Sequence, residues 1–232
     1  MADKVLSEQQ GPPKLGFPFP DFEADTTEGK MKFSEYAKDS WAILFSHPAD
    51  FTPVCTTELG TVSKYLSEFE KRGVKMAALS CDPVDSHKKW IEDIQSSQSL
   101  SGGLGFPIIA DEKREIALKL GMLDPAELDA EGIPLTARAV FIVNPAFKLA
   151  LSLLYPATTG RNFDEIVRVI DSLQLTANHS VATPANWKGG EKTMVVPSLS
   201  DEQATAKFPK GFEKVDVPSG KGYLRFTPDP RD

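Results

Sequence analysis

The stretch SHPADFTPVCTTELG, residues 46–60, decides the fold prediction, because it joins a strand to a helix through a short turn. The apolar run WAILF (41–45) directly before it indicates a buried strand. Thr52 and Pro53 are typical of an N-cap and a first helical residue, since Thr can accept a hydrogen bond from the first turn and Pro has no N–H to lose there. Cys55 then falls at the third helical position.

A cysteine in the first turn of a helix is predicted to be reactive. Its sulfur faces unpaired backbone N–H groups and the positive end of the helix dipole, and both favour the thiolate. We therefore expect the pKa of Cys55 to lie below the usual value of about 8.5, which makes the side chain a nucleophile. The alternative is a buried structural thiol, because free cysteines are among the most buried residues in proteins.

The pattern of apolar runs and turn residues predicts alternating strands and helices along most of the chain. The predicted strands are a hairpin within 22–33 and the runs 41–47, 74–80, 106–110, 139–143 and 149–155. The predicted helices are 53–72, 85–95, 113–120 and 162–175. Residues 124–137 are predicted to form a polar loop. This order predicts an α/β fold in which helices flank a central mixed sheet. A reactive cysteine at the end of an early strand indicates that this fold is thioredoxin-like.

The composition along the chain predicts three segments. Residues 1–14 are polar and are expected to form a flexible extension. Residues 15–177 contain the alternating pattern and are expected to form the thioredoxin-like domain. From residue 178 onward, prolines and glycines interrupt short β-like runs, which predicts a small β-rich C-terminal domain over 178–232.

Charge and hydropathy exclude two classes of partner. The chain has 232 residues and a net charge of −7, and phosphate binding needs a basic face, so nucleic acid is not expected as a partner. No apolar run is long enough to span a membrane, and the polar N-terminus lacks the apolar segment of a secretory signal. The two cysteines, Cys55 and Cys81, favour a reducing compartment, so we expect a cytoplasmic protein.

The remaining candidate residues each have a structural alternative. Cys81 follows an apolar strand and is expected to be a buried structural thiol, which could pair with Cys55 only at a Cα separation of about 6 Å. Arg138 begins the apolar run RAVFIV, where a charge is costly unless paired, so an ion pair and a functional role are both open. Arg161 precedes a helix, where a positive charge is unfavourable, and an exposed surface position is the simpler interpretation.

Metal, cofactor and dithiol chemistry are not expected. The three histidines, His47, His87 and His179, lack metal-ligand spacing with each other or with the cysteines. Thr52 stands where a Cys-x-x-Cys motif would have its first cysteine, so dithiol exchange at this turn is excluded. A lone activated thiolate can still attack an electrophile and pass through a sulfenic acid.

These residues resemble a known family. Pro48-x-x-x-Thr52-x-x-Cys55 is similar to the active-site motif of peroxiredoxins. The longer strings at 46–60, 121–127, 135–145, 153–166 and 181–188 resemble the one-cysteine, peroxiredoxin 6 subfamily, and the resemblance covers roughly residues 15–228. The Val-Cys-Pro segment of two-cysteine members is missing, and Cys81 does not occupy its place.

The resemblance implies a thiol peroxidase that reduces hydrogen peroxide and organic hydroperoxides, with phospholipid hydroperoxides among the candidates. It implies that Cys55 is the peroxidatic cysteine, which becomes a sulfenic acid and is restored by an external thiol of the glutathione type or another small reductant. The implied partners of Cys55 in catalysis are Pro48, which shields the sulfur, Thr52, which hydrogen-bonds the peroxide, and Arg138, which holds the thiolate and the peroxide oxygens. The implied supporting residues are His47, Glu58 and Arg161.

Three further expectations accompany this one. The subfamily is also associated with a phospholipase activity, but both glycines of the Gly-x-Ser-x-Gly context are absent around Ser40, so this activity is not expected. The apolar strand 149–155 is predicted to pair edge to edge in a homodimer, as the family's dimers do. A binding or chaperone-like protein is the alternative of another class, and retained protective activity in Cys55→Ser would favour it.

Overall fold

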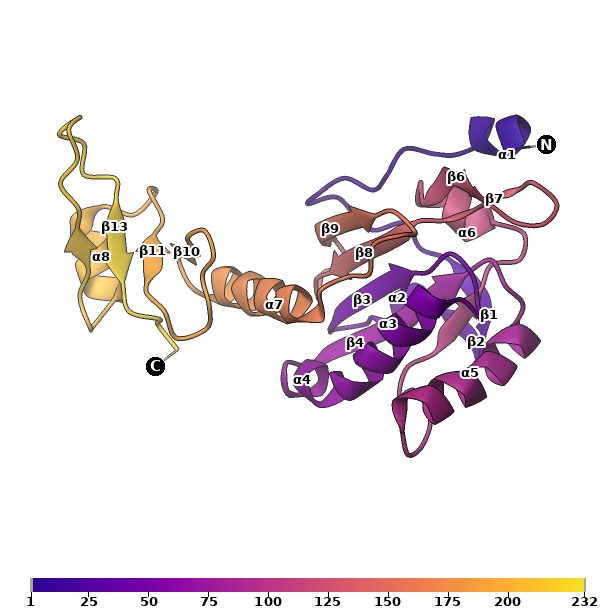
Figure 1. Ribbon diagram of the computed structural model, residues 1–232. Helices are drawn as coiled ribbons and strands as arrows, with labels where there is room; N and C mark the ends of the chain where they lie inside the picture. The colour runs from indigo at the N-terminus through magenta and orange to yellow at the C-terminus, as the bar shows by residue number, and fades with distance from the viewer. Residues whose placement is uncertain (1, 232) are drawn as a thin grey trace. The chain divides into compact units, whose positions relative to one another are not determined.

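The computed structural model describes residues 2–231, and its main element is a seven-stranded sheet in the order β2-β1-β5-β4-β3-β8-β9 (Figure 1). The three central strands β3, β4 and β5 are parallel, and the flanking strands are antiparallel. The strands are β1 Glu23–Thr26, β2 Gly29–Lys32, β3 Trp41–Ser46, β4 Val74–Ser80, β5 Ile108–Ala110, β8 Arg138–Val143 and β9 Leu149–Tyr155. This mixed sheet confirms the predicted thioredoxin-like α/β fold.

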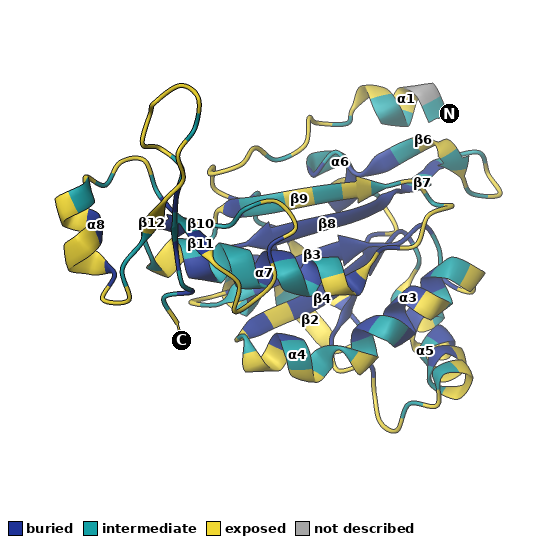
Figure 2. Cartoon of the chain, turned by 60° about the vertical axis from the view of Figure 1, so that its left-hand side comes forward, coloured by how far each residue is buried: buried dark blue, intermediate teal, exposed yellow. Residues whose placement is uncertain are grey.

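The centre of the sheet is built from strands that are buried on both faces. All residues of β8 and all but the first residue of β3 are buried, which Figure 2 shows as dark blue ribbon. Such near-continuous apolar strands occur where helices or loops cover both faces of a sheet. The helices of this part of the chain are α2 Phe33–Tyr36, α3 Pro53–Lys64, α4 Leu66–Lys71, α5 Val84–Gln98 and α6 Glu115–Lys119.

Two predicted segments differ from the structure. The predicted helix 53–72 is broken at Tyr65 into α3 and α4, with Tyr65 outside helical geometry at the junction. The predicted loop 124–137 contains the hairpin β6 Leu123–Leu128 and β7 Pro134–Thr136. The strand was missed because β6 is largely exposed and carries no apolar run, and the Asp129 carboxylate closes its turn by accepting N–H groups from Glu131 and Ile133.

The predicted flexible extension at 1–14 contains a short helix, α1 Ala2–Ser7. Val5 and Leu6 pack against the hydrophobic core of the main sheet. The Gln10 N–H donates to the carbonyl of Leu118 at 2.9 Å, and Gln9 Oε1 accepts the N–H of Leu123. Two apolar side chains and these hydrogen bonds attach the segment to the main domain, which composition alone did not indicate.

The chain divides into two compact units, Met1–Phe163 and Asp164–Asp232. The expected boundary lay after residue 177. It lies earlier in the structure because helix α7 Phe163–Asn178 groups with the second unit, where its Leu175 belongs to a core with Trp187 and Phe208.

Besides α7, the second unit contains a four-stranded sheet in the order β10-β11-β13-β12 and a further helix. Its strands are β10 Val181–Ala182, β11 Thr193–Val195, β12 Glu213–Lys214 and β13 Arg225–Thr227. The helix α8 Asp201–Lys207 was not predicted. Its signal is present in the sequence, because Ser200 and Gln203 form a capping box in which each side chain accepts the other residue's backbone N–H.

Candidate active site

Cys55 is the third residue of α3 and is fully buried. Thr52 occupies the N-cap position and Pro53 the first helical position, as predicted from the sequence. The Thr52 hydroxyl does not cap the helix: it donates to the carbonyl oxygen of Ala49 at 2.9 Å. Because its single hydrogen is used there, the Thr52 oxygen can only accept a further hydrogen bond from a ligand.

Arg138 lies beside the sulfur. It is the first residue of β8, and its Nη1 donates to Cys55 Sγ at 3.3 Å. The same guanidinium is held from a second side, since its Nε and Nη2 donate to the carbonyl of Ala157 at 2.9 and 2.6 Å. A fixed positive charge therefore lies where negative charge on sulfur would develop.

Glu58 connects Arg138 to Arg161. Its Oε2 accepts hydrogen bonds from Arg138 Nη1 at 2.7 Å and Arg161 Nη2 at 2.8 Å, and its Oε1 accepts from Arg161 Nε at 2.9 Å and from the Arg161 backbone N–H at 2.7 Å. Burial raises the pKa of Glu58, but the charge and hydrogen bonds of Arg161, with the charge of Arg138, outweigh it, so this pKa lies below its usual range. Ionised Glu58 thus orients the guanidinium that contacts Cys55.

The interpretation of Arg161 as an exposed surface residue is wrong. Its side chain is buried, and besides Glu58 it donates to the carbonyl of Ala139 at 2.8 Å and lies over the Phe45 ring at 5.3 Å. Arg161 lies just before α7, where a positive charge is unfavourable, as expected. The charge is tolerated because Glu58 neutralises it.

A second buried cluster lies in the turn before α3. His47 Nε2 is 3.0 Å from Asp50 Oδ1, and His87 Nδ1, from α5, is 2.8 Å from Asp50 Oδ2. Ser86 Oγ donates to the same Oδ2 at 2.7 Å. Within residues 2–231, none of the hydrogen bonds of His47 or Asp50 reaches Cys55 or Arg138. Pro48, between the two residues, is buried.

Asp50 and His87 were not among the predicted site residues. A signal for His87 exists, because it lies on the same helix face as Trp90 and Ile94, and a histidine among buried residues needs a polar partner. The donor atoms of His47, Asp50 and His87 lie within 4.8 Å of one another, the arrangement of residue types that could hold a metal ion. His47 Nε2 and His87 Nδ1 already bond to the two Asp50 oxygens, so we interpret the cluster as a hydrogen-bonded network.

Cys81 has the properties of a structural thiol. It is buried and unpaired, directly after β4. Burial, with the nearby charge of Asp111, raises the pKa of Cys81 to about 12. With this pKa, the Cys81 thiol is protonated at neutral pH.

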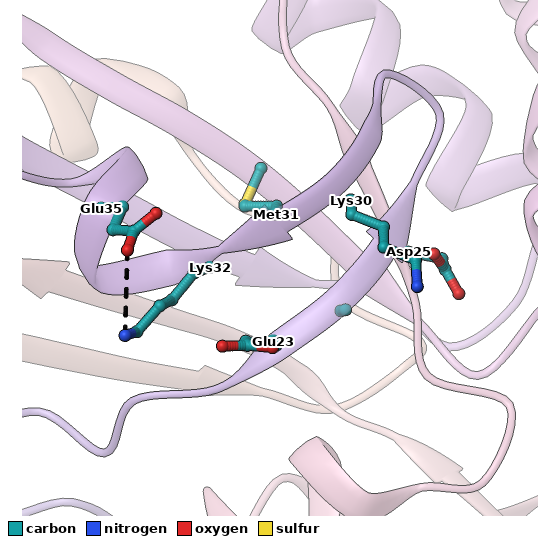
Figure 3. A pocket seen from close by; sticks show the side chains of 7 residues that line it. Glu23, Asp25, Lys30, Met31, Lys32 and Glu35 are labelled. Carbon is teal, nitrogen blue, oxygen red and sulfur yellow. Dashed lines mark ion pairs between the residues drawn. The ribbon is translucent and has the colours of Figure 1, made fainter.

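Two grooves differ in their relation to Cys55. A groove of about 420 Å³ lies over the β1–β2 hairpin, where Figure 3 shows charged side chains and the ion pair between Lys32 and Glu35 at 3.8 Å. Neither cysteine lines it. A groove of about 560 Å³ between α3 and α5 is lined by Phe51, Thr52 and Trp90 among others, and so reaches the N-cap beside Cys55.

Phe51, at the mouth of this second groove, combines two unusual features. The ring is 54% exposed, and the backbone has a left-handed φ of 54°. Left-handed backbone in a bulky residue is strained and clusters at functional sites. The turn is therefore held in place by its neighbours, among them the anchored Asp50.

Two family models match the chain. Residues 15–152 match the AhpC/TSA family, and residues 172–211 match the C-terminal domain of 1-Cys peroxiredoxin. Among curated proteins, the chain is 61% identical to peroxiredoxin-6 of Gallus gallus and 56% identical to peroxiredoxin-6 of Homo sapiens, in each case over 93% of this chain and 97% of the relative.

Two solved structures are similar to this chain in both sequence and fold. A cysteine-to-serine mutant of peroxiredoxin 6 of Arenicola marina is 59% identical, with a TM-score of 0.92 over 94% of this chain and 99% of that one. A yeast mitochondrial 1-Cys peroxiredoxin is 44% identical, with a TM-score of 0.82 over 93% of this chain and 99% of that one. The thiol-resolving mechanism of that yeast protein runs via glutathione/thioredoxin systems.

Proposed function

Because the chain belongs to the AhpC/TSA family and is a one-cysteine peroxiredoxin, a thiol peroxidase, we propose that Cys55 is its peroxidatic residue. The observation that carries this proposal is the 3.3 Å contact between Arg138 Nη1 and Cys55 Sγ in the first turn of α3. Cys81 is the alternative thiol, and its raised pKa argues against it.

The first half-reaction follows from this geometry. The Cys55 thiolate attacks the terminal oxygen of a hydroperoxide, the S–O bond forms, and the O–O bond breaks. The terminal oxygen keeps its hydrogen, which gives a sulfenic acid, and the departing alkoxide or hydroxide takes up a proton. Arg138 is placed to stabilise the negative charge on sulfur and on the departing oxygen.

Thr52 and Pro48 contribute binding and shielding. The Thr52 oxygen can accept the hydrogen of the hydroperoxide, because its own hydrogen goes to Ala49. Pro48, seven positions before Cys55, is buried and has no N–H group that would compete for the peroxide. Glu58 and Arg161 act through Arg138, whose orientation they fix.

An external thiol completes the cycle. One thiol attacks the sulfenic acid to form a mixed disulfide and release water, and a second thiol then displaces Cys55 as a thiolate. Cys81 cannot take the first role at neutral pH while protonated. We propose a small thiol of the glutathione type, in line with the glutathione/thioredoxin systems that serve the yeast relative.

The test is peroxide consumption with a thiol reductant, for wild type, Cys55→Ser and Cys81→Ser. We expect Cys55→Ser to lose activity and Cys81→Ser to retain it. Intact-mass analysis after stoichiometric peroxide should add one oxygen to Cys55. Equal rates for wild type and Cys55→Ser would reject the assignment, and an internal disulfide would reject the one-cysteine cycle.

We propose that the protein forms a homodimer through β9. This strand ends the main sheet. Beyond Leu149, whose backbone pairs with Gly16 and Phe17, one side of the β9 backbone has no neighbouring strand within the described residues, and Leu154 on it is 68% exposed. An open apolar edge is typical of a strand that pairs with a second copy. Sedimentation should show a dimer for wild type and a monomer for Leu154→Lys, and a wild-type monomer would overturn the proposal.

We propose a cytoplasmic location. Both cysteines are unpaired, and an unpaired reactive thiol persists most readily in a reducing compartment. Among the described residues, none of the helices combines the length and the apolar character needed to cross a bilayer. Fluorescence of a tagged full-length chain tests the compartment.

A further inference from the structure

Phe51 is held in a strained backbone conformation by the residues on either side of it. Its φ of 54° lies in the left-handed region, which is unfavourable for a bulky side chain. The N–H of Asp50 donates to Asp82 Oδ2 at 3.0 Å, and the Thr52 hydroxyl donates to the carbonyl of Ala49 at 2.9 Å. Strained residues persist where their surroundings fix the conformation, so this turn sets the direction of the Phe51 ring.

Phe51 exposes its ring at a groove. Two phenylalanines in the described part of the chain are more than half exposed, Phe17 at 62% and Phe51 at 54%. Phe17 is not among the residues that line the groove between α3 and α5, whereas Phe51 lines it together with Thr52 and Pro53. Because a glycine or an asparagine would adopt left-handed backbone with less strain, the fold alone does not explain an aromatic side chain at position 51.

The groove is preformed and large enough for a small organic molecule. Its volume of about 560 Å³ falls within the range of roughly 300–1,000 Å³ that is typical of small-molecule sites. Figure 2 shows its two helices, α3 and α5, side by side. They are joined where Trp90 Nε1, from α5, donates to Thr56 Oγ1, from α3, at 3.1 Å. A ligand therefore enters walls that are already fixed in place.

The wall of the groove that α3 and its N-cap form suits an apolar group. The three threonines of this wall, Thr52, Thr56 and Thr57, each donate their hydroxyl hydrogen to a backbone carbonyl, at 2.9, 2.8 and 2.8 Å. These hydroxyls therefore have no hydrogen left for a ligand. The rings of Phe51 and Pro53 complete the wall. An anionic group would find no hydroxyl donor here, whereas an apolar group needs none.

The place of the groove beside Cys55 fits the shape of an organic hydroperoxide. Cys55 is fully buried, so the small –OOH group has to reach the sulfur while the organic group stays further out. Thr52, whose oxygen is proposed to accept the peroxide hydrogen, also lines the groove. An organic group attached to a peroxide at Thr52 can thus extend over Phe51. Hydrogen peroxide has no such group and makes no contact there.

We propose that Phe51 is a specificity-determining residue whose ring packs against the apolar group of an organic hydroperoxide in the groove between α3 and α5, and so favours such substrates over hydrogen peroxide. This inference rests on the proposed peroxidatic role of Cys55. The chemical step is unchanged, since the thiolate attacks the terminal oxygen and the departing alkoxide carries the organic group. Aromatic rings pair favourably, so an aryl hydroperoxide gains more from Phe51 than an alkyl one.

The kinetic test compares kcat/KM for cumene hydroperoxide with kcat/KM for hydrogen peroxide. The ratio of the two cancels any general effect of a substitution on the reactivity of Cys55. We expect Phe51→Asn, which fits left-handed backbone, to lower this ratio about tenfold, with a smaller fall when tert-butyl hydroperoxide replaces cumene hydroperoxide. Phe51→Tyr keeps the ring and should keep the ratio. The matched control is Phe17→Asn, which removes an equally exposed ring outside the groove and should also keep the ratio.

A binding test does not depend on turnover. Saturation-transfer NMR with cumyl alcohol, the reduced product of cumene hydroperoxide, should show transfer to the aryl hydrogens in Cys55→Ser and its loss when Phe51→Asn is added. An unchanged ratio in Phe51→Asn, an equal fall in Phe17→Asn, or no transfer in Cys55→Ser would overturn this inference and leave the role of Cys55 standing. Peroxidase activity retained in Cys55→Ser would refute the proposed function instead.

Discussion

Arg138 and Glu58 form a buried ion pair in which Arg138 Nη1, 2.7 Å from Glu58 Oε2, is also the atom that donates to Cys55 Sγ. Cys55 and Glu58 are three positions apart on α3, so the sulfur and the carboxylate lie on one face of the helix. Arg138 Nη1 thus makes both the buried ion pair with Glu58 and the contact with the Cys55 sulfur. Changes to either partner of the pair should affect both stability and reactivity.

Replacing Arg138 by Lys should lower the second-order rate with hydrogen peroxide about a hundredfold. Lys keeps the charge but lacks the fork that reaches the sulfur, Glu58 and Ala157 together. The rate is measured by stopped flow. The control is Lys148→Arg, in the turn between β8 and β9, which shows whether exchanging lysine and arginine has a general effect on the rate. A rate within about threefold of wild type would contradict the assignment of Arg138.

Replacing Glu58 by Gln should destabilise the protein by about 3 kcal/mol at pH 7, because two buried guanidinium groups lose their counter-charge. The pKa of Glu58 is lowered in the folded state. An acid of this kind stabilises the fold above its unfolded-state pKa and loses that contribution as the pH falls through its folded-state pKa. The difference between wild type and variant in urea unfolding should be constant from about pH 7 to about pH 5 and shrink at lower pH.

Thr52→Val should reduce the peroxide rate about a hundredfold, while Thr52→Ser should retain most of it. Val keeps the shape of the side chain but has no oxygen to accept the hydrogen of the peroxide. Ser retains the hydroxyl that donates to Ala49. Equal rates for the Val and Ser variants would show that the oxygen of Thr52 does not contact the substrate.

Alkylation should distinguish the two cysteines. Burial and Asp111 raise the pKa of Cys81 to about 12, so at about pH 8 iodoacetamide should modify Cys55 and leave Cys81 unmodified in the folded protein. Peptide mass spectrometry locates the modification. Unfolding in urea removes the protection of Cys81, and both thiols should then react.

The strand-turn-helix around Cys55 was predictable because each step has a local cause. Trp41–Ser46 is buried on both faces and reads as one apolar run, and Thr52-Pro53 marks a helix start whatever lies around it. The run Val74–Ser80 was predicted with its observed bounds for the same reason. The division of helix 53–72 at Tyr65 and the exposed strand β6 depend on tertiary contacts and turn geometry, which the apolar pattern does not record.

The sequence predicts which residues form the site better than it predicts which of them contact each other. The motif resemblance named Arg138, Glu58 and Arg161, but local reasoning about Arg161 favoured the surface, because its partner is 103 positions away. Asp50 and His87 are likewise joined across 37 positions. Such contacts depend on how the sheet brings distant turns together.

The buried ion-pair network beside Cys55 has a net positive charge. Arg138 and Arg161 carry two positive charges and Glu58 one negative charge, so an ionised sulfur makes this interior neutral. Oxidation to the uncharged sulfenic acid removes that balance and leaves a cation in a medium of low polarity. The sulfenic acid is thereby a less favourable occupant of the site than either anion, since reduction to thiolate or further oxidation to a sulfinate would restore neutrality.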